Sequence, residues 1–300
     1  MTASIEIVEV GPRDGLQNEA ALLSVEDRIA FIERLERAGV RRIEAVSFVN
    51  PRRVPQMAGA EEIMAALPKE PGVSRIGLVL NERGWERCVA ARCDEANVVV
   101  CASDGFGIRN QGAPVAEQVA TMVRIAERRA LEGGPALSMT VSVAFGDPFD
   151  GEVSEDQVVA IAAEAARAGI GEIALGDTIG VADPWTVRRR IAAVRKVAPD
   201  ARIRMHFHNT RNTGFANVFA SIEAGAAVID ASCGGIGGCP FAPDATGNIG
   251  TEDLVYMLER AGIATGIDLG AMIAAARWVG DKLGKDVPSA LTHAGGFPSK

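Results

Sequence analysis

The segment Arg202-Ile203-Arg204-Met205-His206-Phe207-His208-Asn209 joins a strand-like run to two of the three histidines of the chain. A β-strand points residues i and i+2 to the same face, so the spacing predicts that the imidazoles of His206 and His208 converge. Two imidazoles that share one face at the end of a strand can bind a single metal ion. The alternative is a pair of hydrogen-bonded, inert polar residues at a strand end.

Seven further apolar, β-branched runs have the pattern of strands, and amphipathic stretches of helical periodicity separate them. The eight predicted strands are residues 5–10, 42–46, 75–80, 97–101, 138–144, 172–175, 203–208 and 228–231. The predicted helices include residues 24–38, 115–131, 154–168, 184–197, 212–224 and 269–283. Strands separated by helices pair in parallel, because parallel neighbours need a crossover connection.

Eight such strand–helix units over about 260 residues predict an α/β protein with a (β/α)8 TIM barrel and an additional C-terminal helix. A doubly wound open sheet is the alternative, but it usually carries a Gly-rich first turn, and Gly11-Pro12-Arg13-Asp14-Gly15 lacks that pattern. We expect one domain over residues 1–300, with the barrel at about 5–265 and a helical extension at 266–300.

Composition narrows the class of protein. A hydrophobic fraction of 48% and a charged fraction of 23% are typical of a globular chain with a full core. The net charge is −8 with scattered Lys and Arg, so no nucleic-acid partner is expected. No apolar run reaches the ~18 residues of a membrane span, and the N-terminus shows no signal or transit pattern. We therefore expect no membrane partner. The five cysteines form no CxxC pair, which favours a reducing, cytoplasmic location.

Polar residues gather where the predicted strands end, which is where TIM barrels carry their chemistry. They are Arg13, Asp14 and Gln17 after the first strand, Glu44 in the second, Asp177 and Thr178 after the sixth, and His206 and His208 ending the seventh. Asp14 with the two histidines offers mixed nitrogen and oxygen ligands that suit Mg²⁺, Mn²⁺ or Zn²⁺ with open positions for a substrate. Arg13 could stabilise an oxyanion or enolate, although adjacent Arg and Asp residues more commonly form a solvated loop pair.

Two other carboxylates have competing interpretations. Glu44 lies in an apolar strand, where a charge is costly unless it is paired. It either orients Arg13 or takes part in catalysis, and the orienting role is favoured. Asp177 is a candidate catalytic residue, and the alternative is that it caps the turn that follows its strand.

The segment after the eighth strand, Cys233-Gly234-Gly235-Ile236-Gly237-Gly238-Cys239-Pro240, has four glycines in five positions. Such a backbone can approach a ligand closely or move over it, so Gly237 and Gly238 are candidate substrate-binding positions together with Arg13 and Gln17. A phosphate cradle is an alternative for this loop. Cys239 could donate or accept a proton, or could be a small buried side chain.

These segments together resemble the 3-hydroxy-3-methylglutaryl-CoA (HMG-CoA) lyase family of metal-dependent barrel lyases. The resemblance covers about residues 5–270 and is densest at residues 8–19, 43–49, 175–180, 206–208, 235–240 and 247–258. It implies a divalent metal, Mg²⁺ or Mn²⁺, bound by Asp14, His206, His208 and Asn248. It also implies a homodimer and an acyl-CoA thioester as the substrate.

The same resemblance implies a retro-Claisen cleavage of a 3-hydroxyacyl-CoA, which in the family gives acetyl-CoA and acetoacetate. Arg13 would stabilise the enolate, and His206 or Cys239, the latter on a mobile active-site loop, would move the protons. Positions that the family uses for support or catalysis are occupied by Gln17, Glu44, Asp177 and Glu252.

Three segments depart from the family pattern. Asn209 stands where these lyases usually have Asp, residues 140–148 lack the usual cysteines, and Asp104 replaces the usual Glu after Ser103. We expect these positions to lie near the barrel mouth, where substrate identity is decided, so citramalyl-CoA or a longer branched 3-hydroxyacyl-CoA is a competing substrate.

Two further hypotheses belong to other classes. A Claisen-condensing synthase of the isopropylmalate or homocitrate type would explain Asn209, but its usual eighth-strand loop is replaced here by Gly-Gly-Cys-Pro-Phe. A barrel that only binds a ligand is disfavoured by the intact set Arg13, Asp14, His206, His208 and Cys239.

Overall fold

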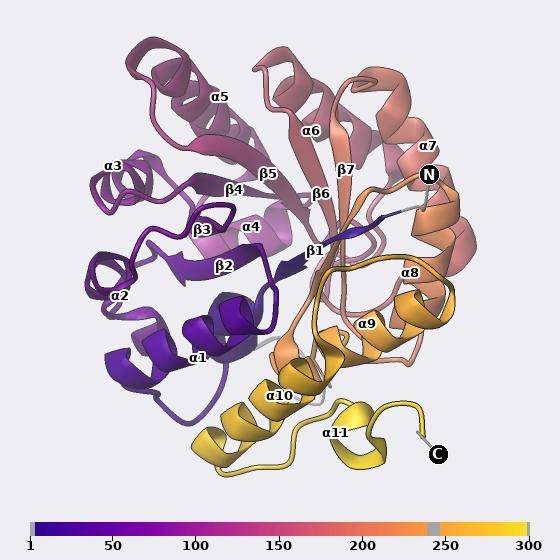
Figure 1. Ribbon diagram of the computed structural model, residues 1–300. Coiled ribbons are helices and arrows are strands. Elements are labelled where there is room, and N and C mark those ends of the chain that lie inside the picture. The colour runs from indigo at the N-terminus through magenta and orange to yellow at the C-terminus, as the bar shows by residue number, and fades with distance from the viewer. Residues whose placement is uncertain (1–3, 239–246, 299–300) are drawn as a thin grey trace.

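A closed barrel of eight parallel strands forms the centre of the protein, in a computed structural model that describes residues 4–238 and 247–298 (Figure 1). The strands are β1 (Glu6–Glu9), β2 (Arg42–Ser47), β3 (Ser74–Val79), β4 (Glu95–Cys101), β5 (Ala136–Ser142), β6 (Glu172–Asp177), β7 (Arg202–Phe207) and β8 (Val228–Ala231). β1 pairs with β2 and also with β8, which closes the barrel. The TIM-barrel prediction is confirmed, and the predicted strand ends differ from the observed ends by at most two residues.

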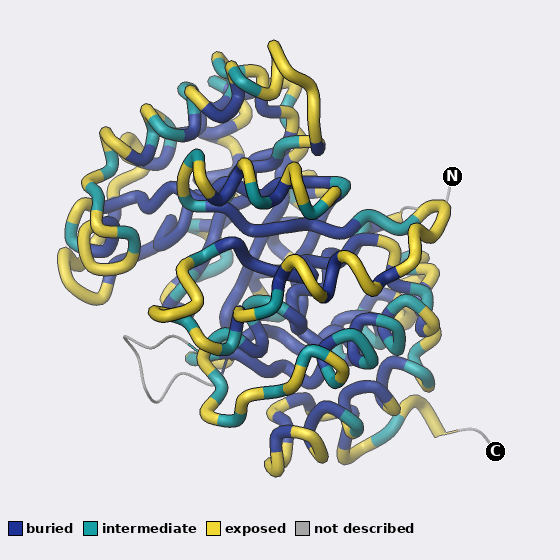
Figure 2. The backbone as a smooth tube through the Cα atoms, turned by 90° about the vertical axis from the view of Figure 1, so that its left-hand side faces the viewer, coloured by how far each residue is buried: buried dark blue, intermediate teal, exposed yellow. Residues whose placement is uncertain are grey.

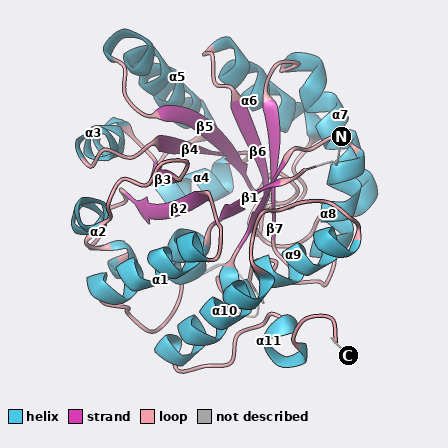
Figure 3. Cartoon of the chain, in the orientation of Figure 1, coloured by secondary structure: helices cyan, strands magenta, loops and turns pink. Residues whose placement is uncertain are grey.

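Helices surround the barrel, as Figure 3 shows. They are α1 (Val25–Arg37), α2 (Ala60–Ala66), α3 (Glu82–Ala90), α4 (Asp104–Gln111), α5 (Val115–Glu132), α6 (Glu155–Arg167), α7 (Pro184–Val197), α8 (Gly214–Glu223), α9 (Thr251–Arg260), α10 (Leu269–Leu283) and α11 (Leu291–Ala294). Single-turn helices cover Gly11–Gly15, Pro55–Met57 and Cys233–Gly235. Among the described residues, none of the helices combines the length and apolar character needed to cross a membrane.

Local sequence signals explain where the helices begin. The Ser24 hydroxyl accepts a hydrogen bond from the Asp27 N–H, and Ser154 forms a reciprocal capping box with Gln157 at the start of α6. Figure 2 shows that the strands are almost wholly buried while the helices alternate between buried and exposed, as expected of amphipathic helices that cover a core. At the C-terminus, α10 packs against α1 and α9 and closes one side of the ring (Figure 1).

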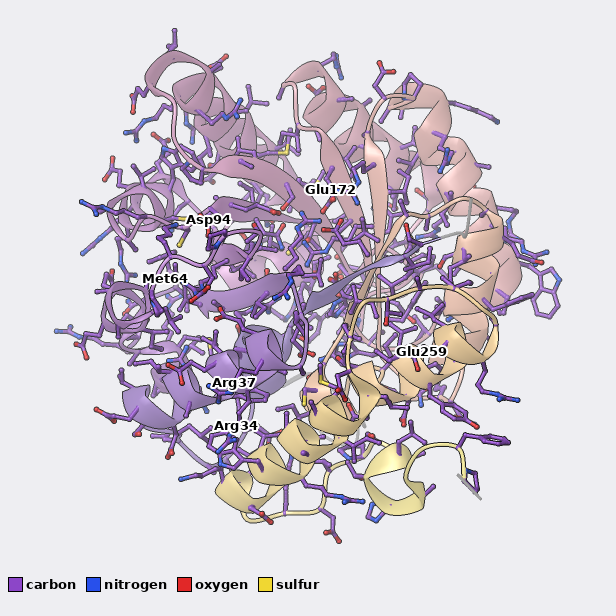
Figure 4. All side chains as sticks on the ribbon, viewed as in Figure 1. Arg34, Arg37, Met64, Asp94, Glu172 and Glu259 are labelled. Atoms are coloured by element: carbon purple, nitrogen blue, oxygen red, sulfur yellow. The ribbon has the colours of Figure 1, made fainter. Side chains whose placement is uncertain are left out.

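The interior of the barrel holds ion pairs at the N-terminal end of its strands. Barrel interiors are usually filled by branched apolar side chains. Here Arg42 opens β2 and donates two hydrogen bonds to Glu95 at the start of β4 (2.7 and 2.9 Å) and two to Glu172 at the start of β6 (2.7 and 2.9 Å). Glu172 is labelled in Figure 4. We call Arg42, Glu95 and Glu172 the barrel floor, and their mutual pairing offsets the cost of burying charge.

Candidate metal centre and active site

A cavity of about 530 Å³ opens at the C-terminal end of the strands. Its wall includes polar side chains from several strands and from the loops that follow them: Arg13, Asp14, Asn97, Thr140, His206 and His208. This is the end of a TIM barrel at which active sites are built. Of the polar residues predicted to gather at the strand ends, the cavity wall brings together Arg13, Asp14, Gln17, Thr178, His206 and His208.

Asp14, His206 and His208 form a compact cluster whose potential ligand atoms all lie within 4.8 Å of one another. Asp14 Oδ2 is 3.9 Å from His206 Nε2 and 3.6 Å from His208 Nε2. His206 lies in β7 and His208 follows its last residue, so the strand alternation places both rings on the inner face. The two imidazoles converge as the sequence spacing predicted, and this cluster is the candidate metal centre.

Asn248 lies against this cluster. Its Nδ2 donates hydrogen bonds to Asp14 Oδ2 (2.8 Å) and to the Ile236 carbonyl (3.1 Å). Its Oδ1 is buried without a hydrogen-bond partner among the described residues, as is His208 Nδ1. A buried acceptor without a partner costs about 1–3 kcal/mol, and an amide oxygen is a suitable ligand for a hard cation. The donor set of carboxylate, amide and two imidazoles therefore fits Mg²⁺ or Mn²⁺.

The charge state of Asp14 supports the same fit. Burial would raise the pKa of Asp14, but the Arg13 guanidinium and the two imidazoles outweigh burial and hold this pKa well below its ordinary value. Asp14 is thus ionised and ready to bind a cation.

Arg13 is held between two carboxylates. It donates through Nη1 to Asp14 Oδ1 (2.6 Å), and its Nε and Nη2 both contact Glu44 Oε2. Glu44 Oε1 accepts a hydrogen bond from Asn97 Nδ2 (2.9 Å), which fixes the carboxylate in turn. These contacts match the interpretation that Glu44 orients Arg13. Since a guanidinium has five N–H bonds, two remain for a ligand in the cavity.

Sequence reasoning missed Asp230 and Arg204. Asp230 Oδ2 lies 3.1 Å from His206 Nδ1, and both carboxylate oxygens accept hydrogen bonds from the Arg204 guanidinium. Each is a charged residue inside a strand, which is the same signal that singled out Glu44. Applied to β7 and β8, that signal would have found both residues.

Asp177 does not line the cavity, and its carboxylate contacts the turn that follows β6. Its carboxylate accepts hydrogen bonds from the N–H groups of Val181 (2.8 Å) and Ala182 (3.1 Å). Burial raises the pKa of Asp177, while the two N–H donors and the nearby His208 oppose that rise. The contacts are those of the turn-capping alternative, and a catalytic role for Asp177 stays a prediction.

The glycine-rich loop lies directly over the metal centre. Gly237 has φ +105°, and a Cβ there would lie 2.7 Å from Asn248 Nδ2 and 3.0 Å from the Asp14 carbonyl oxygen. Only glycine lets this backbone approach the candidate ligands so closely. Gly238 and Gln17 line the cavity, as expected of substrate-binding positions, whereas Cys239 falls outside the described residues.

Two buried carboxylates support this loop from below. Glu9 accepts hydrogen bonds from Gly11 N (2.7 Å), Cys233 N (2.9 Å) and the Thr251 hydroxyl (2.6 Å), and Glu252 accepts from Gly234 N (3.0 and 3.1 Å). Burial raises the pKa of Glu9 to about 8 and that of Glu252 to about 7. Glu9 therefore ties the loop after β1 to the loop after β8, a role that was not predicted from the sequence.

The chain is similar to known acyl-CoA lyases over nearly its whole length. Residues 4–279 match the model of the HMGL-like family. The chain is 44% identical to an (R)-citramalyl-CoA lyase of Chloroflexus aurantiacus, over 97% of this chain and 95% of that protein. It is 40% identical to a 3-hydroxy-3-isohexenylglutaryl-CoA/hydroxymethylglutaryl-CoA lyase of Pseudomonas aeruginosa, over 97% and 96%. A solved HMG-CoA lyase of Acinetobacter baumannii, in complex with coenzyme A and 3-methylmalate, superposes with a TM-score of 0.94 at 40% identity and covers 100% of both chains.

Proposed function

The chain belongs to the HMGL-like family of acyl-CoA lyases, and we propose that it cleaves a 3-hydroxy-3-methylglutaryl-CoA-like thioester to acetyl-CoA and acetoacetate with the help of Mg²⁺ or Mn²⁺. The observation that carries the proposal is the cluster Asp14, His206 and His208, with Arg13 beside it in the wall of one cavity. A cation site next to a free guanidinium edge suits a reaction in which a hydroxyl group loses its proton and a thioester becomes an enolate.

In the proposed cleavage, a bound Mg²⁺ or Mn²⁺ would supply Lewis acidity that makes the 3-hydroxyl group of the substrate more acidic. A general base takes the hydroxyl proton, the carbonyl of the ketone forms as the C2–C3 bond breaks, and the electron pair of that bond passes into the thioester to give an enolate. The two free N–H bonds of Arg13 donate to the enolate oxygen, and one such donor is worth about 3–4 kcal/mol. Protonation of C2 completes acetyl-CoA.

The two predicted proton carriers, His206 and Cys239, are given different roles in this proposal. His206 Nδ1 contacts Asp230 and its Nε2 faces Asp14, so metal binding would engage both ring nitrogens. We therefore assign His206 to the metal and propose Cys239 as the acid that protonates C2. Cys239→Ser should fold normally and lower kcat by about 10²–10⁴-fold, since a positioned proton donor contributes that much. An unchanged kcat would remove Cys239 from the mechanism.

Citramalyl-CoA is the second candidate substrate, favoured by the Chloroflexus aurantiacus relative. Its acyl group is one methylene shorter than that of HMG-CoA and would give pyruvate with acetyl-CoA. Thr140 and Ser142, from the segment 140–148 that departs from the family pattern, line the cavity. Asp104 and Asn209 do not: Asp104 Oδ1 accepts a hydrogen bond from Val115 N, and Asn209 Oδ1 accepts one from Gly214 N. One methylene changes transition-state binding by only about 1–3 kcal/mol, so these few side chains can decide the preference.

The test is to identify the products. Protein treated with EDTA and reloaded with Mn²⁺ is incubated with HMG-CoA and with the two citramalyl-CoA enantiomers, and acetoacetate, pyruvate and acetyl-CoA are quantified. The proposal predicts the highest kcat/KM for HMG-CoA, with acetoacetate and acetyl-CoA in equal amounts. A higher kcat/KM for either citramalyl-CoA would move the assignment to the second candidate. Cleavage of none of them would overturn both, and Asp14→Asn is the matched inactive control.

A further inference from the structure

Two charged residues lie directly below His206 in the barrel interior. Arg204 is two residues before His206 on β7, so both side chains point inward. Asp230 is the neighbour of His206 in the register of β8. The side chains of Arg204 and Asp230 are 1% and 4% exposed, so each charge requires a partner.

Arg204 and His206 both contact the carboxylate of Asp230. Arg204 Nε donates to Asp230 Oδ1, and Arg204 Nη2 donates to Asp230 Oδ2 (3.0 Å). The same Oδ2 lies 3.1 Å from His206 Nδ1. Both oxygens of the buried carboxylate thus face N–H groups of a guanidinium, which has no proton to release. Asp230 is therefore a charged acceptor towards the ring.

An ionised acceptor at Nδ1 sets the tautomer of the neutral imidazole. The proton must lie on Nδ1, which leaves the lone pair of Nε2 directed at Asp14 Oδ2. We propose that Arg204 and Asp230 are positioning residues that fix the tautomer and ring orientation of His206 for metal binding. This inference rests on the metal-dependent function proposed above, and it adds residues that make no contact with the metal.

The alternative is that Arg204 and Asp230 form a purely structural ion pair, as Arg42 does with the carboxylates of the barrel floor. The floor residues make no hydrogen bond to a candidate metal ligand in the described structure, whereas Asp230 shares one oxygen between Arg204 and His206. A structural pair would affect stability alone. A positioning pair must also affect the protonation pattern of the His206 ring.

Asp230→Asn separates these two cases. The carboxamide offers one oxygen to three donors, Arg204 Nε, Arg204 Nη2 and His206 Nδ1. The guanidinium cannot give up a proton, whereas the imidazole can move its proton to the other ring nitrogen, so the conflict is expected to be relieved at His206. The amide nitrogen then faces His206 Nδ1, where only the tautomer protonated on Nε2 can accept from it. That tautomer has no lone pair for the metal. Arg204→Lys is the second variant, because a lysine cannot hold both carboxylate oxygens at once.

The first measurement uses metal-free protein and requires no activity. Nitrogen-15 NMR at about pH 8.5 reports the tautomer of each neutral histidine, and the chain has only three. Wild-type His206 should be protonated on Nδ1, and Asp230→Asn should shift the ring to the Nε2 form. The second measurement is the Kd for Mn²⁺, which should rise about 10–100-fold in Asp230→Asn and by a smaller factor in Arg204→Lys. Arg75→Lys is the control, because Arg75 is equally buried and pairs with Glu36 far from His206.

The outcomes separate this inference from the proposed function. An unchanged tautomer and an unchanged Kd for Mn²⁺ in folded Asp230→Asn would overturn the positioning role and leave the lyase assignment intact. A wild-type protein that binds Mn²⁺ with the predicted tautomer but cleaves no acyl-CoA would overturn the lyase assignment alone. If Asp230→Asn does not fold, Arg204→Lys decides: a Kd equal to that of Arg75→Lys contradicts the inference, and a higher Kd supports it.

Discussion

The two ends of the barrel interior both hold buried polar groups, but they are paired differently. At the floor, Arg42 donates four hydrogen bonds to Glu95 and Glu172. At the mouth, Asn248 Oδ1 and His208 Nδ1 are buried without a partner among the described residues. The floor shows how this chain pairs buried charge when only stability is required. The mouth keeps potential ligand atoms unpaired at a cost in stability, as a site arranged for a ligand would.

The largest expected effect is at the mouth. His208→Ala should lower kcat/KM by at least about 1000-fold and abolish retention of Mn²⁺, because it removes one of the clustered candidate metal ligands. The temperature of unfolding of the metal-free protein should fall, since the buried ring and its Nε2 contact with Asp14 are lost, so the kinetics are measured well below that temperature. Steady-state kinetics and metal analysis after dialysis test this. His293→Ala, at an exposed histidine of α11, is the control, and metal retention in His208→Ala would refute the ligand assignment.

The next effect, at the floor, has the opposite pattern. Arg42→Met removes four hydrogen bonds from two buried carboxylates, so the free energy of unfolding should fall by about 3–5 kcal/mol. The Kd for Mn²⁺ of the folded variant should stay that of the wild type. Urea unfolding and Mn²⁺ titration measure both quantities. Arg37→Met, on the outer side of α1 and labelled in Figure 4, removes an exposed ion pair and should cost less than about 1 kcal/mol. Equal stability losses in the two variants would show that the ion pairs of the barrel floor stabilise the fold no more than an exposed ion pair does.

The third expected effect is a dependence of stability on pH, and it concerns Glu9 below the glycine-rich loop. Burial raises its pKa from 4.5 to about 8, so the folded protein keeps a proton that the unfolded chain releases. This contribution to stability is complete below about pH 4.5 and is lost as the pH rises towards 8. Glu9→Gln keeps the hydrogen bonds without the titration, so its stability relative to the wild type should rise with pH.

Urea unfolding at several pH values between 5 and 8 measures this difference. Glu70→Gln, at an exposed position on the surface, should follow the wild type at every pH. A constant difference between Glu9→Gln and the wild type across this range would show that Glu9 is ionised throughout.

Much of the fold could be predicted from the sequence because the strands differ so clearly in pattern from the helices between them. The same barrel geometry made Asp14, His206 and His208 predictable as neighbours, because β1 and β7, which are far apart in the chain, end on the same side of the barrel. Spacing within β7 then fixed the face of both histidines.

Pairing partners were harder to predict than positions. A carboxylate inside a strand, such as Glu44 or Asp230, signals a partner without naming it, because the partner comes from another strand or loop. Asp177 shows the same limit: its choice between catalysis and turn capping depends on whether the N–H groups of Val181 and Ala182 turn back towards it. The packing of Gly237 on Asn248 depends on the path of a loop, which no periodicity describes.

Removal and return of the metal test whether a cation at Asp14, His206 and His208 is required for cleavage. Protein stripped with EDTA is titrated with Mn²⁺ while free Mn²⁺ is followed by electron paramagnetic resonance and acetyl-CoA release from HMG-CoA and citramalyl-CoA is assayed in parallel. We expect one Mn²⁺ to bind per chain and activity to return in proportion to the bound Mn²⁺. In Asp14→Asn, neither Mn²⁺ binding nor acetyl-CoA release should be seen. Full activity in stripped protein, or Mn²⁺ binding that Asp14→Asn leaves unchanged, would contradict it.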